Sequence, residues 1–112
     1  MSDIHIIVKE ILENTLAVTE DSGSLLFNEI CSKFDELDDT SNDKIILDFS
    51  GIELITTAFL NKCIGIDLFK KFNIDKVGTR LKITNIPDED TLKLFKLVLG
   101  MAITVKQKEQ SD

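Results

Sequence analysis

Short apolar runs separated by polar turn residues recur along the chain and predict alternating strands and helices. The strand-like runs occupy residues 4–8, 15–20, 44–49, 80–84 and 101–106. The run KIILDF at 44–49 has a continuously apolar centre, which is typical of a strand buried on both faces of a sheet. The turn-like pair Glu13 and Asn14 separates the first two runs, so we expect an N-terminal hairpin.

Three other segments carry apolar residues at helical spacing. In residues 25–37 the apolar face consists of Leu26, Ile30, Phe34 and Leu37. In residues 58–72 it is broader and includes Phe59, Leu60, Cys63, Ile64, Ile66, Leu68 and Phe69. The third helix is expected to begin after Pro87, with Asp88, Glu89 and Asp90 at the positive end of its dipole. Its expected inward face is Leu92, Phe95 and Leu99, with Gly100 as the C-cap.

This order predicts an α/β fold with a mixed central sheet of about five strands and about three helices. Residues 1–107 are expected to form one domain, and residues 108–112 a disordered tail. The acidic segment at 35–43 is expected to end the first helix as a solvated loop.

Charge and composition indicate which classes of binding partner are not expected. The chain has 112 residues, 43% of them hydrophobic, and a net charge of −7. Such an acidic surface repels phosphate backbones and anionic lipid, so neither nucleic acid nor a membrane is expected as a partner. The N-terminus lacks the basic region of a signal peptide, and we expect a cytoplasmic protein. Cys31 and Cys63 have apolar neighbours and are expected to be free, buried thiols.

The residues do not favour an enzyme, a metal site or a cofactor. His5 is the only histidine and lies in an expected strand, away from any recognisable nucleophile. The glycines are isolated and form no phosphate-binding loop. A Cys/His cluster is absent from the sequence, so no zinc site is expected.

Two adjacent threonines, Thr56 and Thr57, precede the second expected helix. Either hydroxyl could cap that helix by accepting a hydrogen bond from its first turn. Either could instead accept a phosphate, whose charge would be stabilised by the same free N–H groups. The two roles are compatible, and both remain open.

The stretch LDFSGI at 47–52, followed by Thr56 and Thr57 at a helix start, resembles the STAS domain (sulphate transporter and anti-sigma factor antagonist), more narrowly a STAS-like single-domain protein. The expected element order is similar to that family from about residue 4 to 105. Thr57 falls at the position of the family's phosphorylatable serine, and Thr56 at that of the preceding aspartate. Ala58 and Phe59 replace the Ser-Gly that follows in the family.

The resemblance implies a bacterial, non-enzymatic interaction module that acts like an anti-sigma factor antagonist. Its partner would be an ATP-binding anti-sigma or histidine-kinase-like protein that phosphorylates Thr57, or else Thr56. The expected interaction surface comprises Ser50, Asn61, Lys62 and Gly65, whereas Asp48 and Gly51 are expected to support the site structurally. The alternative is a STAS-like module that binds a small ligand or nucleotide without phosphorylation. A homodimer remains open.

Overall fold

A parallel three-stranded sheet forms the centre of the computed structural model, which describes residues 3–37 and 43–111. Its strands are β1 (Ile4–Ile7), β3 (Ile45–Asp48) and β5 (Leu81–Thr84), in the order β1-β3-β5. Ile45 of β3 is in register with Ile4 on one side and Leu81 on the other. The α/β class is therefore confirmed. The KIILDF strand lies in the middle of this sheet, but the expected burial on both faces is partial, because Ile45 and Leu47 are buried and Ile46 is half-buried.

The predicted N-terminal hairpin is wrong. After β1 the chain turns into the short helix α1 (Val8–Leu12), which ends at Glu13 in the left-handed conformation, with a φ of 54°. The next strand, β2 (Leu16–Ala17), pairs in parallel with β4 (Leu54–Ile55) as a separate two-stranded sheet. Within the described ranges, the five strands thus form two small parallel sheets rather than one mixed sheet.

Helices cover the sheet and connect its strands. They are α2 (Glu20–Glu36), α3 (Thr57–Ile64), α4 (Ile66–Lys71), α5 (Ile74–Arg80) and α6 (Glu89–Ser111). The first predicted helix starts earlier than expected, because Thr19 caps α2 by accepting a hydrogen bond from the Ser22 N–H at 3.1 Å. The sequence pattern did not predict α1 or α5, which are short. The expected loop at 38–42 lies outside the described residues.

The helix predicted over residues 58–72 is divided at Gly65 into α3 and α4. A side chain at Gly65 would collide with the carbonyl oxygen of Asn61, one turn earlier in the chain. The apolar face continues across this break, because Phe59, Cys63 and Phe69 are all buried as expected. The glycine therefore allows a change of direction that the hydrophobic pattern alone does not reveal.

The strand predicted at 101–106 is also wrong, because α6 continues through these residues to Ser111. Its buried face consists of Phe95, Val98 and Ala102, at intervals of three and four that carry the helical period past Gly100. Gly100 is thus inside the helix and is not a C-cap. Leu92, which we expected to point inward, is 38% exposed.

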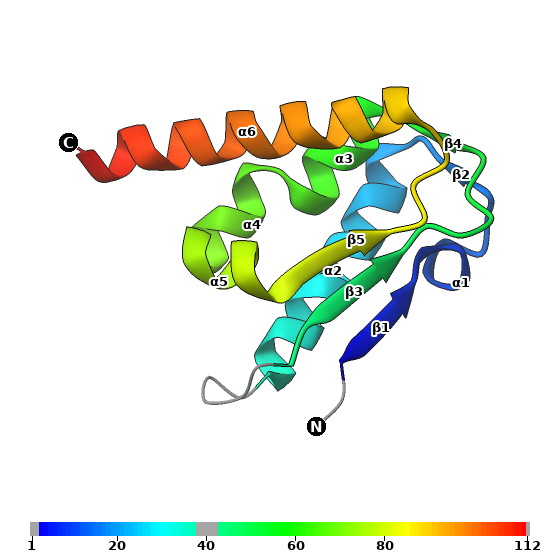
Figure 1. Cartoon of the computed structure of the whole chain (residues 1–112), viewed down its shortest axis with the longest axis horizontal. Coiled ribbons are helices and arrows are strands. Elements are labelled where there is room, and N and C mark those ends of the chain that lie inside the picture. Colours follow the sequence, from blue (N-terminus) through cyan, green and yellow to red (C-terminus); the bar gives the residue numbers. More distant parts are fainter. Residues whose placement is uncertain (1–2, 38–42, 112) are drawn as a thin grey trace.

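One hydrophobic core joins the sheet to the helices. Its largest fully buried side chains include Phe34, Phe49, Phe59, Phe69 and Phe95. Figure 1 shows α6 running along one side of the molecule, with α3 and α4 lying between it and the sheet, and α6 contacts both of them. The C-terminal part of α6 projects beyond α4 in this view.

Candidate functional site

The start of α3 is built around the Thr56 side chain. Thr56 is the N-cap, and its Oγ1 accepts a hydrogen bond from the Phe59 N–H at 3.3 Å. The same hydroxyl donates to the carbonyl oxygen of Val18 at 2.7 Å. The backbone N–H of Thr56 donates to the carbonyl oxygen of Ala17 at 3.1 Å. Thr56 is half-buried and committed to structure, so the capping role that the sequence left open belongs to this residue.

Thr57 is placed differently. It is the first residue of α3 and is exposed to solvent. The first turn of α3 contains no acidic residue, whereas α2 begins with Glu20 and Asp21. The free N–H groups and the positive dipole end of α3 are therefore not offset by an acidic side chain of that turn. This helix start can accommodate an added negative charge next to an accessible hydroxyl.

A second polar cluster lies at the carboxyl end of β3. Asp48 accepts hydrogen bonds at Oδ1 from the Ser50 N–H and from the side-chain amide of Asn85, both at 2.9 Å. These bonds, above all the one from Asn85, hold the pKa of Asp48 below its usual range. Gly51 follows with a φ of 81°, and an added Cβ there would lie 3.1 Å from Cδ of Lys9. Asp48 and Gly51 therefore belong to a hydrogen-bonded turn after β3, and their supporting role at a site stays a prediction.

Asn85 is the residue of this cluster that the sequence analysis missed. It follows β5 and has a φ of 59°, a conformation that asparagine tolerates better than most residues. A lone asparagine directly after a strand is the signal that could have indicated a turn. Its contact with Asp48 could not have been read from the sequence, because 37 positions separate the two residues.

The two clusters stand at the ends of different strands. Asp48 ends β3, whereas Thr56 follows β4. Between them, the Glu53 N–H donates to the carbonyl oxygen of Thr15 at 2.7 Å, and the Thr15 hydroxyl donates to the Glu53 carboxylate at 2.7 Å. The Asp48 turn is therefore a support for the chain that leads toward α3, not a part of its first turn.

The residues expected to form the interaction surface have different environments. Ser50 and Asn61 are exposed and Lys62 is half-buried, but Gly65 is buried. Thr57 and Asn61 are one helical turn apart and lie on the same exposed side of α3. The packing of Gly65 against its own helix favours a structural role for it. Ser50 belongs to the Asp48 turn.

The described residues contain neither a candidate metal-binding cluster nor a helix able to span a membrane. Over residues 3–37 and 43–111, no group of three or more His, Cys, Asp or Glu side chains is arranged to hold a metal ion. None of the helices in these ranges combines the length and apolarity required to span a bilayer. Cys31 and Cys63 are both free and buried, as predicted.

Comparison with known proteins supports the resemblance noted in the sequence. No curated protein and no solved structure matches the chain. A family model described as a STAS-like domain of unknown function (DUF4325) matches residues 22–91, which include the Asp48 turn and all of α3. At the level of the family, a STAS-like domain indicates a regulatory or interaction module. Because the match covers more than half of its length, the chain belongs to the DUF4325 family of STAS-like domains.

Proposed function

We propose that this protein is a non-enzymatic regulatory module that binds a protein partner through the start of α3, and that phosphorylation of Thr57 weakens the complex. The proposal rests on the resemblance to anti-sigma factor antagonists and on the different environments of Thr56 and Thr57. The Thr56 hydroxyl bonds to both Val18 and Phe59, whereas Thr57 is exposed at the first helical position. Thr57 is therefore the better acceptor of a phosphate.

The chemistry requires a partner that binds ATP. The Thr57 oxygen attacks the γ-phosphorus of ATP, the bond from that phosphorus to the bridging oxygen breaks, and ADP leaves. The hydroxyl proton passes to a base of the partner, because the first turn of α3 itself contains no histidine and no acidic residue that could act as one. An ATP-binding anti-sigma or histidine-kinase-like protein would supply both the nucleotide and the base.

The same charge has opposite effects on the free domain and on the complex. In the free domain, a phosphate at Thr57 lies near the positive end of α3, so folding tolerates it. In a packed interface, nearly two negative charges arrive where the partner has excluded water, and repulsion and desolvation oppose binding. We expect a loss on the order of 2 kcal/mol of binding free energy.

The test is co-purification of the ATP-binding protein encoded nearby with wild type, Thr57→Ala and Thr57→Glu. Thr79→Glu is the matched control, because Thr79 is another exposed helical threonine, in α5. Intact masses are measured after incubation with ATP and magnesium. We expect one phosphate on wild type and none on Thr57→Ala, and we expect the partner to be lost only with Thr57→Glu.

Three outcomes would contradict this proposal. A phosphate on Thr57→Ala that disappears with Thr56→Ala would move the site by one residue. Equal binding by all variants without any phosphate would remove the switch. Binding of a nucleotide or small ligand at Thr56 and Thr57, without phosphate transfer, would favour the alternative ligand-binding function.

A further inference from the structure

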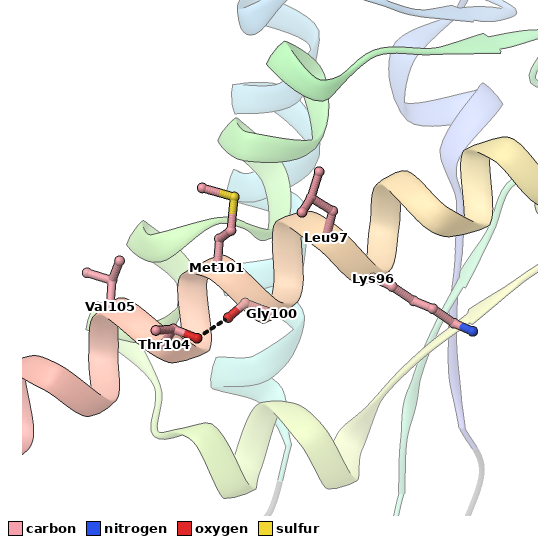
Figure 2. A pocket seen from close by; sticks show the side chains of 6 residues that line it. All are labelled: Lys96, Leu97, Gly100, Met101, Thr104 and Val105. Atoms are coloured by element: carbon pink, nitrogen blue, oxygen red, sulfur yellow. Dashed lines mark hydrogen bonds between the residues drawn. The ribbon is translucent and has the colours of Figure 1, made fainter.

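One side of α6 is apolar but exposed. Leu97, Met101 and Val105 are 55%, 62% and 44% exposed, and they recur every four residues. We call these three residues the α6 stripe. Figure 2 shows them projecting from the same side of the helix, while Lys96 extends away from them. The buried face of α6 is formed by other residues, Phe95, Val98 and Ala102, so the stripe is not needed to hold the helix to the core.

Hollows border the stripe on both sides. One has a volume of about 420 Å³ and is lined only by α6, through Lys96, Gly100, Thr104 and the three stripe residues. The other, about 210 Å³, lies between α6 and the α3–α4 junction, where Asn61, Gly65 and Ile66 line it together with Met101 and Val105. Met101 and Val105 therefore form a ridge between two depressions, a shape that a second helix can engage.

Gly100 and Thr104, at the base of the larger hollow, leave no unsatisfied hydrogen-bond donor there. Gly100 has no side chain, and the Thr104 hydroxyl donates to the Gly100 carbonyl oxygen at 2.8 Å within the helix. Apolar side chains of a partner can therefore fill this hollow without stripping water from an unsatisfied donor. Met101, which is unbranched, adapts its shape to such side chains.

The charges around the α6 stripe indicate which kind of molecule can bind there. Residues 91–108 contain four of the thirteen basic residues of the chain and none of its twenty acids. These four are Lys93, Lys96, Lys106 and Lys108. In a protein with a net charge of −7, this part of α6 is a local basic segment around an apolar centre, although Glu89 and Asp90 precede it in the helix. It complements an apolar segment flanked by acids.

The charges disfavour two other occupants. In a two-fold dimer centred on Met101, antiparallel helices would bring Lys96 of one copy near Lys106 of the other, since each is five residues from the centre. An anionic membrane would attract these lysines, but it would repel the acidic remainder of the domain. A separate acidic protein segment avoids both costs.

We propose that the α6 stripe docks an amphipathic helix of another protein, with apolar residues at four- and three-residue intervals and acidic residues beside them. This is the helix-in-groove mode of recognition, in which a few apolar anchors supply affinity and flanking charges supply specificity. The proposal does not require the Thr57 switch, because it rests on α6 and needs no modification, although Asn61 borders both surfaces.

The test uses two fluorescein-labelled helical peptides of about 18 residues, long enough to present four or five turns. They share one leucine stripe and differ only in carrying glutamate or lysine beside it. The full chain is titrated into each peptide and anisotropy is followed. We expect the glutamate peptide to bind at least about tenfold tighter than the lysine peptide. Met101→Glu is expected to weaken that binding by about tenfold or more.

Leu25→Glu is the matched control, because Leu25 is 53% exposed on α2 and its replacement adds the same charge. It should leave binding unchanged. The double variant Lys93→Glu with Lys96→Glu should reverse the preference, so that the lysine peptide binds more tightly. Amide NMR shifts in wild type should concentrate at the α6 stripe, and circular dichroism should show all variants folded.

The proposal is overturned if the two peptides bind equally, if Leu25→Glu causes the same loss as Met101→Glu, or if the peptide shifts amides elsewhere. Sedimentation showing a dimer that Met101→Glu dissociates would identify a second copy as the occupant instead. Binding to phosphatidylserine vesicles that Met101→Glu abolishes, without peptide binding, would assign the stripe to a lipid surface.

Discussion

Replacing Gly23 with alanine is expected to destabilise the protein, although alanine is the better helix former. Gly23 is a buried residue of α2 at its contact with α3. A Cβ at this position would lie 2.6 Å from Cβ of Lys62 and 2.6 Å from the carbonyl oxygen of Phe59. Both distances are far shorter than an ordinary van der Waals contact, so α2 and α3 would have to move apart.

Two opposing effects determine the magnitude. Alanine in a helix interior gains about 1 kcal/mol over glycine. Overpacking a well-packed contact costs about 1–3 kcal/mol. The upper part of that range applies here, because the Phe59 carbonyl belongs to the backbone and cannot rotate away as a flexible side chain would. We therefore expect the free energy of unfolding to fall by about 1–2 kcal/mol.

Urea unfolding measures this change, and Gly100→Ala is the matched control. Gly100 is a helical glycine at which an added Cβ meets nothing within 4 Å, so alanine there should add about 0.5–1 kcal/mol. A C-cap glycine, as the sequence suggested, would instead make that variant less stable. If Gly23→Ala proved as stable as wild type while Gly100→Ala gained stability, the close contact between α2 and α3 would be refuted.

Two further predictions concern the Asp48 turn and the thiols. Asp48→Asn should keep the fold and lower the free energy of unfolding by about 1 kcal/mol, because Asn85 and the Ser50 N–H lose an ionised acceptor. Complete loss of the thermal unfolding transition would show that Asp48 contributes far more to folding than these two hydrogen bonds explain. The folded pKa of Asp48 is lowered, so this carboxylate stabilises the folded protein above the unfolded pKa of about 3.9. That stabilisation is lost as pH falls through the folded pKa. The melting temperatures of Asp48→Asn and wild type should therefore converge at acid pH. Cys31 and Cys63 should react slowly with a thiol reagent in the native state, because burial excludes the reagent and raises the pKa of both thiols. Rapid labelling of native Cys63 would mean that the core around α3 opens.

Features determined by neighbouring residues could be predicted from the sequence. The central strand was recognisable from its apolar run, and Ile45, Leu47 and Phe49 on one of its faces are buried, whereas Ile46 on the other face is half-buried. The hydrogen bond from the Ser50 N–H to Asp48 and the cap at Thr56 also follow from residues two or three positions apart. These short-range signals located the supporting turn and the start of α3.

Features decided by distant contacts could not be predicted. Residues 101–106 alternate and contain β-branched side chains, so the local pattern suggested a strand. They are helical because Ala102 extends the face that Phe95 and Val98 bury, a case in which tertiary packing overrides propensity. The hairpin failed for a similar reason. The partner of β2 is β4, far along the chain, rather than the nearby β1.

The pairing of β2 with β4 also affects the order in which the protein can fold. The Thr56 hydroxyl that caps α3 donates to Val18, 38 positions earlier in the chain. This arrangement cannot form from local contacts, since the chain must first close a long loop and place β4 beside β2. The first turn of α3 should therefore become ordered late in folding. In hydrogen exchange, the Phe59 amide would acquire protection together with the amides of Glu53 and Thr56, which donate to Thr15 and Ala17, rather than before them. Because the cap of α3 depends on Val18, a peptide containing α3 alone would lack the fixed first turn that exposes Thr57 to solvent.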